Sequence, residues 1–208
     1  MRPVICMITD GRLAGHGGVA ALVERVSAAV RAGVDLVQVR EGAVDDRVLA
    51  AVVSGCVRAV RGTRARVVVN DRLDVAIACG AQGVHLKSDS YPAARARALA
   101  PAGFLIGRSV HSAAEAIRAD GADYVIFGAV FPTSSKPGQT PAGLAALEET
   151  VRTTTRPVLA VGGVTVETAG PVARTGAAGV AAIGMFADRA ASALPAVVQS
   201  LTRAFDAR

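Results

Sequence analysis

The chain has 208 residues, of which 51% are hydrophobic and 19% are charged. That length and composition fit one globular domain with its own core and exclude an intrinsically disordered chain. A net charge of +6 without a long basic run, and only 3% aromatic residues, disfavour a nucleic-acid surface and leave small anionic ligands as the preferred partners.

Eight short runs of apolar and β-branched residues are predicted to be buried strands, and none is long enough to span a membrane. They lie at residues 4–8, 36–39, 67–70, 83–86, 104–110, 124–127, 158–161 and 179–183. Helical periodicity fills most of the intervals, at residues 19–31, 45–61, 74–79, 92–100, 112–120, 141–152 and 165–175, with a terminal helix expected from about residue 190.

The alternation of strands and helices predicts a parallel sheet with right-handed crossovers. Eight such units in a chain of this length favour a single (β/α)8 TIM barrel domain over residues 1–208. A doubly wound open sheet is the alternative. No dinucleotide-binding glycine pattern follows the first strand, however, because Gly15, Gly17 and Gly18 lack its spacing.

Polar side chains stand at the carboxyl ends of the predicted strands, where this kind of barrel places its chemistry. Gln38 and Arg40 are two residues apart on the second strand and therefore share a face, while the valines beside them suit the helix layer. A buried guanidinium needs an anion nearby. That anion is either a ligand or a protein carboxylate, for which Glu41 and Asp71 are available.

Asn70 and Asp71 follow the third strand. A carboxylate beside an amide at a strand end can hold Mg²⁺ together with phosphate oxygens. The same aspartate is equally suited to cap the short helix that follows, so the pair alone leaves both interpretations open.

The loop after the sixth strand is rich in hydroxyls and leads to Lys136, one of only two lysines in the chain. Hydroxyls such as those of Thr133 and Ser135 can donate hydrogen bonds to phosphate oxygens, and the lysine supplies a point charge. A phosphate-binding loop is therefore predicted here, with a plain polar surface loop as the alternative.

Glycines follow the last two strands: Gly162 and Gly163 after the seventh, and Gly184 after the eighth. Barrels of this kind often bind a phosphate at these two loops, because glycine lets backbone N–H groups approach the oxygens closely. The alternative is that these glycines only form tight turns.

The histidines and cysteines suggest no classical catalytic or metal cluster. His85 lies within an apolar strand and is predicted to be a core residue, whereas His111 stands near the mouth and its role stays open. Three cysteines in apolar surroundings, an odd number without metal-type spacing, suit a reducing cytoplasm. The N-terminus shows no secretory signal, so a cytoplasmic location is expected.

Several motifs together resemble the thiamine phosphate synthase and TenI superfamily over nearly the whole chain. They are VQVRE (37–41), NDRLDVA (70–76), GVHL (83–86), IGRSVHS (106–112), GADYVIFGAVFPTSSK (121–136) and AVGGVT (160–165). The resemblance implies a (β/α)8 barrel of thiamine biosynthesis. In the synthase branch, an aminopyrimidine methyl pyrophosphate loses pyrophosphate, and the nitrogen of a thiazole phosphate captures the resulting cation.

The resemblance also implies roles for single residues. By analogy, Gln38, Arg40, Asn70 and Lys136 bind the pyrophosphate, Asp71 binds Mg²⁺, and Ser109 lies near the reacting pyrimidine. Thr133, Ser135, Gly163, Ile183 and Gly184 correspond to contacts with the thiazole phosphate. The expected partners are therefore small phosphorylated substrates, with a homo-oligomer left open.

Three positions depart from the synthase pattern. Gly42 replaces a lysine, Ser90 replaces the second Mg²⁺ aspartate although Asp89 is adjacent, and Gly184 replaces a serine. Losing one charged donor is expected to cost about 100-fold in rate unless Lys87 or Asp89 compensates.

Two alternative functions are weighed against the synthase. TenI-type tautomerases share several of these motifs, but their catalytic histidine falls on Ala129 here, so such an enzyme would need another base, for example His111. A barrel that only binds thiazole or thiamine phosphate is the second alternative, and Gly42 and Ser90 motivate it.

Overall fold

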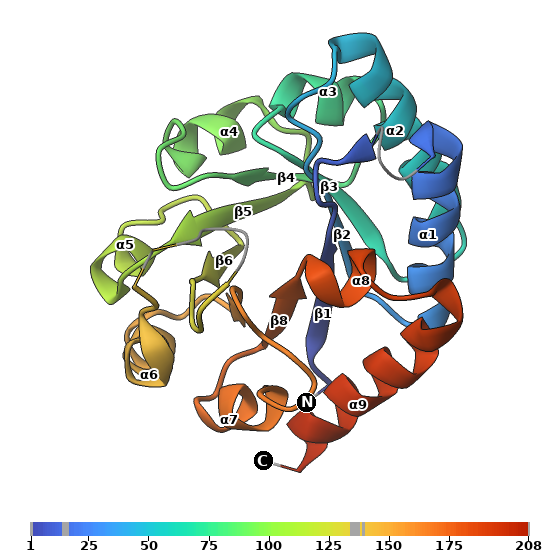
Figure 1. Cartoon of the computed structure of the whole chain (residues 1–208). Coiled ribbons are helices and arrows are strands. Elements are labelled where there is room, and N and C mark those ends of the chain that lie inside the picture. Colours follow the sequence, from blue (N-terminus) through green and yellow to red (C-terminus); the bar gives the residue numbers. More distant parts are fainter. Residues whose placement is uncertain (1, 14–16, 134–137, 139, 208) are drawn as a thin grey trace.

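The chain folds into a closed barrel of eight parallel strands surrounded by helices (Figure 1). This computed structural model describes residues 2–13, 17–133, 138 and 140–207. The strands are β1 (Val4–Ile8), β2 (Leu36–Val39), β3 (Arg66–Asn70), β4 (Gly83–Leu86), β5 (Leu105–Val110), β6 (Tyr124–Phe127), β7 (Val158–Ala160) and β8 (Gly179–Ala182). They follow one another in chain order, and β8 pairs with β1 to close the barrel, which confirms the predicted (β/α)8 architecture.

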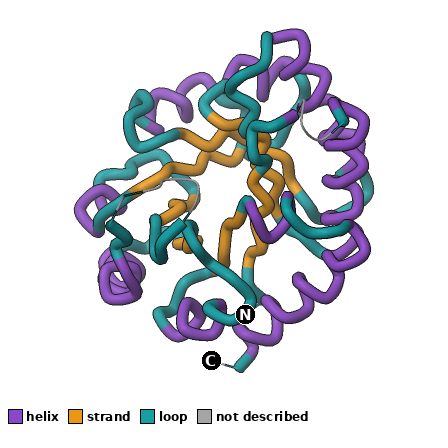
Figure 2. Tube along the Cα trace, viewed as in Figure 1, coloured by secondary structure: helices purple, strands orange, loops and turns teal. Residues whose placement is uncertain are grey.

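Helices follow the strands, and all but the short helix after β8 form an outer ring around them (Figure 2). They are α1 (Gly18–Ala32), α2 (Asp46–Ala59), α3 (Leu73–Ala78), α4 (Ala93–Leu99), α5 (Ala113–Ile117), α6 (Gly143–Thr153), α7 (Ala169–Arg174), α8 (Gly184–Ala187) and α9 (Leu194–Asp206), with a 3-10 turn, η2 (Ala191–Ala193), before α9. Within the described part of the chain, no helix combines the length and apolarity needed to cross a membrane.

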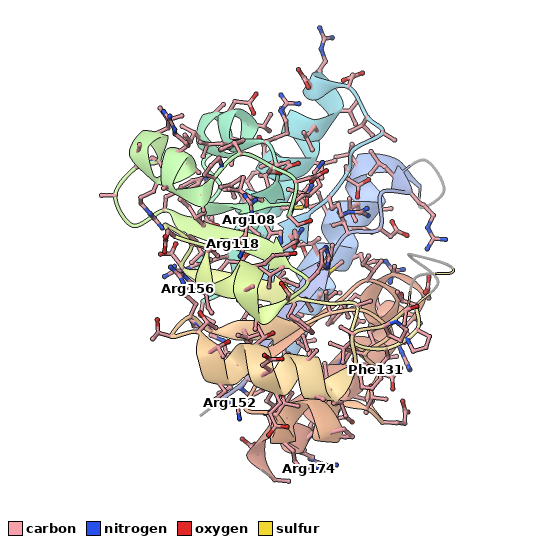
Figure 3. The ribbon with its side chains drawn as sticks, turned by 90° about the vertical axis from the view of Figure 1, so that its left-hand side faces the viewer. Arg108, Arg118, Phe131, Arg152, Arg156 and Arg174 are labelled. Carbon is pink, nitrogen blue, oxygen red and sulfur yellow. The ribbon has the colours of Figure 1, made fainter. Side chains whose placement is uncertain are left out.

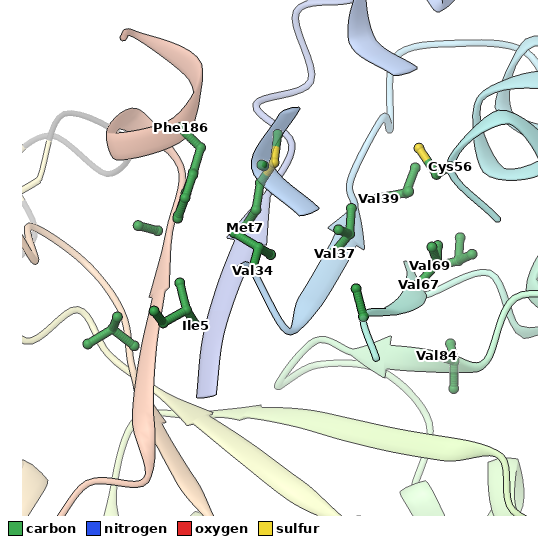
Figure 4. Close-up of a cluster of buried hydrophobic side chains, with 14 of the residues drawn as sticks. Ile5, Met7, Val34, Val37, Val39, Cys56, Val67, Val69, Val84 and Phe186 are labelled. Atoms are coloured by element: carbon green, nitrogen blue, oxygen red, sulfur yellow. The ribbon is translucent and has the colours of Figure 1, made fainter. Parts of the chain in front are cut away.

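The larger part of the core lies between the strands and the helices (Figure 4). Val37, Val39, Val67 and Val69 all face outward into this layer, because alternate residues of a strand point to opposite faces. The predicted assignment of Val37 and Val39 to the helix layer is therefore confirmed. It follows that Leu36, Gln38, Val68 and Asn70 point into the barrel.

A second, smaller cluster fills the interior of the barrel. Its members include Cys6, Ile8, Tyr124, Ile126 and Leu159, all buried. Apolar side chains thus close the barrel below its carboxyl end, and the polar groups on the same strands stand above this floor. The cysteines are free thiols, with Cys6 and Cys56 buried as predicted and Cys79 partly exposed.

All eight strands lie within one residue of their predicted ends, but α7 begins later than predicted. The segment before it forms a turn in which the backbone N–H of Thr165 donates to Oγ1 of Thr168 at 2.8 Å, and the N–H of Thr168 donates back to Oγ1 of Thr165 at 3.3 Å. Threonine hydroxyls compete in this way with helical hydrogen bonds, so the helix starts only at Ala169.

Candidate functional site

A cavity of about 950 Å³ opens at the carboxyl end of the barrel. Eight of the predicted site residues line it, from six strands or the loops that follow them: Gln38, Arg40, Asn70, Ser109, Thr133, Gly163, Ile183 and Gly184. Ile8, Ile126, Val161 and Ala181 form apolar parts of its wall. Asp71 is not part of this lining, and the predicted Ser135 and Lys136 lie outside the described residues.

Gln38 and Asn70 form an amide pair on neighbouring strands. Gln38 is almost fully buried, and its Nε2 donates to Oδ1 of Asn70 at 3.0 Å. Among the described residues, Oε1 of Gln38 has no hydrogen-bond partner, which is costly for a buried polar atom. If the oxygen and nitrogen of both side-chain amides are exchanged, the hydrogen bond between them is kept, and Gln38 has an N–H instead of an oxygen without a partner among the described residues. Either way, the pair has hydrogen-bonding capacity left for a ligand.

Arg40 is exposed at the mouth, contrary to the expected buried guanidinium. The buried Thr9 fixes its backbone, because Oγ1 of Thr9 accepts from the Arg40 N–H at 2.7 Å. Glu41 turns away and accepts from the N–H of Gly11 at 3.3 Å, while Asp71 pairs with Lys87. The alternative prediction, an ion pair of Arg40 with Glu41 or Asp71, is therefore wrong. Within the described chain its guanidinium has no carboxylate partner and is free for an anion.

Asp71 occupies a left-handed backbone conformation, with φ of 62°, that aspartate tolerates better than most residues. Its carboxylate accepts from the backbone N–H of Lys87 at 3.1 Å and from the Ser90 hydroxyl, and it pairs with Nζ of Lys87 at 2.7 Å. Burial by itself raises the pKa of Asp71, but the hydrogen bonds from Lys87 and Ser90 outweigh burial and lower it. The alternative role as a cap of α3 is wrong, since that helix has no side-chain cap.

The loop after β4, which carries Lys87 to Tyr91, is tied to β5 by one side chain. The guanidinium of Arg108, labelled in Figure 3, donates to the carbonyl oxygens of Ser88 at 2.9 Å, Ser90 at 3.1 Å and Tyr91 at 2.6 Å. Three hydrogen bonds from one planar cation hold the loop in place. The loop therefore presents Lys87 and Asp89 to the cavity in a defined position.

A chain of polar groups in contact links β4, β5 and β6 inside the barrel. Nδ1 of His85 lies 3.2 Å from the Tyr124 hydroxyl, and Nε2 lies 2.9 Å from the Ser109 hydroxyl. His85 lies inside the barrel as predicted, but it also lines the cavity and contacts a predicted site residue. Sequence reasoning missed this link, although the outward Val84 and Leu86 already place His85 inside the barrel.

Burial lowers the pKa of His85 to about 3, so the imidazole is neutral at physiological pH and orients the Ser109 hydroxyl without carrying charge. The unfolded chain binds a proton near pH 6.5, so stability is lost as pH falls between these values. We therefore expect the free energy of unfolding to fall by about 2 kcal/mol between pH 7 and pH 5 because of His85. Urea titrations of the native chain and of His85→Gln measure it: equal losses in both proteins would contradict the prediction.

His111 is engaged at both ring nitrogens. Its Nδ1 contacts the carbonyl oxygen of Gly128, which assigns the ring proton to Nδ1, and its Nε2 lies 3.3 Å from the Ser88 hydroxyl. Ala129 presents only a methyl group to the same cavity. Neither position offers a base that is free of protein contacts.

The loops after β6 and β7 pack directly against each other. The N–H of Val130 donates to the carbonyl of Val161 at 2.9 Å, and the N–H of Phe131 donates to the carbonyl of Gly162 at 3.0 Å. Gly163 has φ of 63°, and a Cβ there would lie 2.3 Å from the carbonyl oxygen of Pro132. Glycine is therefore required for this contact, which brings Thr133 to the same rim as Gly163.

Comparisons with known proteins agree with this geometry. A family model described as thiamine monophosphate synthase matches residues 5–186. The chain is 38% identical to thiamine-phosphate synthase of Chlorobium luteolum, over 87% of this chain and 84% of that protein. It is 41% identical to the thiamine-phosphate synthase of Methanoculleus marisnigri, over 85% of this chain and 84% of that protein.

Solved structures give the same result. The thiamine phosphate pyrophosphorylase from Pyrococcus furiosus superposes with a TM-score of 0.82 and 32% identity, covering 98% of this chain and 96% of that one. A 3-hexulose-6-phosphate synthase, with a TM-score of 0.67, 21% identity, and coverage of 98% and 99%, shares the fold alone.

Proposed function

The chain belongs to the thiamine monophosphate synthase family, and we propose that its barrel mouth joins an aminopyrimidine methyl diphosphate to a thiazole phosphate. The reaction breaks the bond between the pyrimidine methylene carbon and the diphosphate oxygen, and the bonding electrons leave with the diphosphate. The lone pair of the thiazole nitrogen then forms the new bond to that carbon. The observation that carries the proposal is the guanidinium of Arg40, which has no carboxylate partner among the described residues and lies at the rim of a cavity large enough for both substrates.

The diphosphate is proposed to lie over the ends of β2, β3 and β4. Arg40 supplies charge there, and the amide pair of Gln38 and Asn70 supplies hydrogen bonds. Negative charge grows on the diphosphate as the bond breaks, so donors fixed in advance stabilise the transition state more than the ground state. Lys136 is proposed as a further donor on the basis of the resemblance.

The thiazole phosphate is proposed to lie on the opposite side of the mouth, over the ends of β6, β7 and β8. Thr133, Gly163, Ile183 and Gly184 line that side, and Ser135 is added by the resemblance. Ser109, on β5 between the two sides, is proposed to contact the pyrimidine, with its hydroxyl oriented by His85. Apolar side chains beneath keep water from the reacting carbon.

The sequence predicts a Mg²⁺ ion at Asp71. Mg²⁺ takes oxygen ligands at octahedral positions and is commonly held by one or two carboxylates and the substrate phosphates. Here both oxygens of Asp71 already accept hydrogen bonds from Lys87 and Ser90, and the described residues contain no cluster of three metal-binding side chains. This donor set does not fit a resident Mg²⁺ ion.

A cytoplasmic location is also proposed, and the three free thiols support it.

The proposed function is tested by incubating the purified chain with the pyrimidine diphosphate and the thiazole phosphate. We expect thiamine phosphate and pyrophosphate in equal amounts. Tight binding of thiamine phosphate without turnover would instead indicate a binding protein. Isomerisation of a thiazole carboxylate phosphate without any joining reaction would indicate a tautomerase.

Gly163→Ala is expected to raise KM for the thiazole phosphate at least about tenfold and to leave KM for the pyrimidine diphosphate unchanged. The added Cβ would lie 2.3 Å from the Pro132 carbonyl oxygen and would displace the rim that carries Thr133. Steady-state kinetics with each substrate varied in turn measure the split. Gly103→Ala is the matched control, because Gly103 also has positive φ, 75°, but open space around its Cβ position. Equal effects of the two variants would exclude the rim contact as the cause.

A further inference from the structure

The carboxylate of Asp71 is enclosed by donors from a single segment, the loop after β4. Nζ of Lys87 lies 2.7 Å from Oδ2, while the Lys87 N–H, at 3.1 Å, and the Ser90 hydroxyl both reach Oδ1. Arg108 fixes the same loop through three backbone carbonyl groups. The ion pair thus joins the loops that follow two neighbouring strands, and Arg108 fixes one of these loops.

Lys87 also lines the cavity. Arg40 lines it as well, whereas Asp71 is not part of the lining. The side chain of Lys87 is about half exposed, at 54%, and that of Asp71 is 23% exposed. The hydrogen bond and the negative charge of Asp71 raise the pKa of Lys87, although the nearby charge of Arg40 acts in the opposite direction. Asp71 therefore allows two cations to face the same part of the cavity.

An ammonium has three donor hydrogens, and one carboxylate partner leaves the others for a ligand. Two cations beside the amide pair of Gln38 and Asn70 match a diphosphate, which spreads its negative charge over two groups. A divalent ion at Asp71 would have to displace Lys87 and the Ser90 hydroxyl. It would also sit beside the two positive charges of Lys87 and Arg40.

We propose that Lys87 is the resident cation of the diphosphate site and that this chain binds and releases pyrophosphate without a divalent metal ion. The inference rests on the proposed function, since it names the group that stabilises the leaving diphosphate. Lys87 keeps its protons throughout and donates hydrogen bonds to diphosphate oxygens as their charge grows. Asp71 is a positioning residue, which holds the ammonium and does not contact the substrate.

Two measurements on the full chain test the proposal. Calorimetry with inorganic pyrophosphate in excess EDTA is expected to show binding by the native chain, weakened about 100-fold in Lys87→Ala. Synthase turnover in EDTA is expected to stay within about twofold of turnover with Mg²⁺ in the native chain, and to fall about 100-fold in Lys87→Ala, as for the loss of one charged donor. Arg95→Ala is the control, because it removes an exposed positive charge from α4, outside the cavity.

A metal-binding variant gives a readout that is independent of turnover. Mn²⁺ electron paramagnetic resonance is expected to show no stoichiometric site in the ligand-free native chain and one site in Lys87→Ala/Ser90→Asp. A native chain that loses both pyrophosphate binding and turnover in EDTA, and recovers them with Mg²⁺, would overturn the proposal while leaving the synthase function intact. If no thiamine phosphate forms with or without metal, the proposed function fails, and pyrophosphate binding in EDTA still decides the role of Lys87.

Discussion

Arg40→Ala is expected to lower kcat/KM for thiamine phosphate formation by about 100- to 1,000-fold. The loss of one preorganised donor to developing negative charge has an effect of this size in other enzymes. At Arg40 the effect should reach the upper end, because its guanidinium has no carboxylate partner among the described residues and faces the cavity. Most of the loss should appear in kcat, since the charge it neutralises grows as the bond breaks.

The stability of Arg40→Ala should stay close to that of the native chain. The side chain is exposed, and the hydrogen bond from its backbone N–H to Thr9 does not depend on the guanidinium. Steady-state kinetics together with urea unfolding separate the two effects. Arg40→Lys should recover part of the rate, because it restores a point charge without the planar pair of donors. A loss of less than about threefold in Arg40→Ala would place the diphosphate elsewhere in the cavity.

Gly107→Ala is expected to lower the free energy of unfolding by about 3 kcal/mol, the upper part of the range for overpacking a core. Gly107 lies on β5 between His85 of β4 and Tyr124 of β6. A Cβ there would lie 2.2 Å from Cζ of Tyr124 and 2.4 Å from Nδ1 of His85. Both rings are buried, so neither can move into solvent, and their hydrogen bond would be broken.

Urea unfolding measures this loss, and Tyr124→Phe is the matched comparison. Tyr124→Phe removes the hydroxyl that contacts His85 but adds no volume, so it should lower stability by only about 1 kcal/mol. Gly107→Ala should also reduce turnover, because displacement of His85 moves the Ser109 hydroxyl. If Gly107→Ala is as stable as the native chain, the barrel interior accommodates the added methyl group and the prediction is wrong.

The sequence alone was sufficient to predict the architecture. Strands and helices differ in the spacing of their apolar residues, and that spacing is local, so all eight strands could be located to within one residue. The same alternation placed Gln38 and Arg40 at the mouth of the barrel, where both line the cavity. Because parallel strands in a barrel bring their carboxyl ends to one rim, polar residues far apart in the chain could be assigned to one cavity.

Only the tertiary structure decided which of these polar groups meet. Asp71 and Lys87 lie at the ends of neighbouring strands, and their 2.7 Å contact depends on the register of β3 and β4 and on a left-handed backbone at Asp71. The chain from Tyr124 through His85 to Ser109 likewise needs three strands in register around Gly107. Sequence spacing gives the direction in which a side chain points, whereas a hydrogen bond or ion pair requires distances that only closure of the barrel sets. The sequence therefore determined the residues that surround the cavity. The closed barrel decided that Asp71 pairs with Lys87, while Arg40 has no carboxylate partner in the part of the chain that the structure describes.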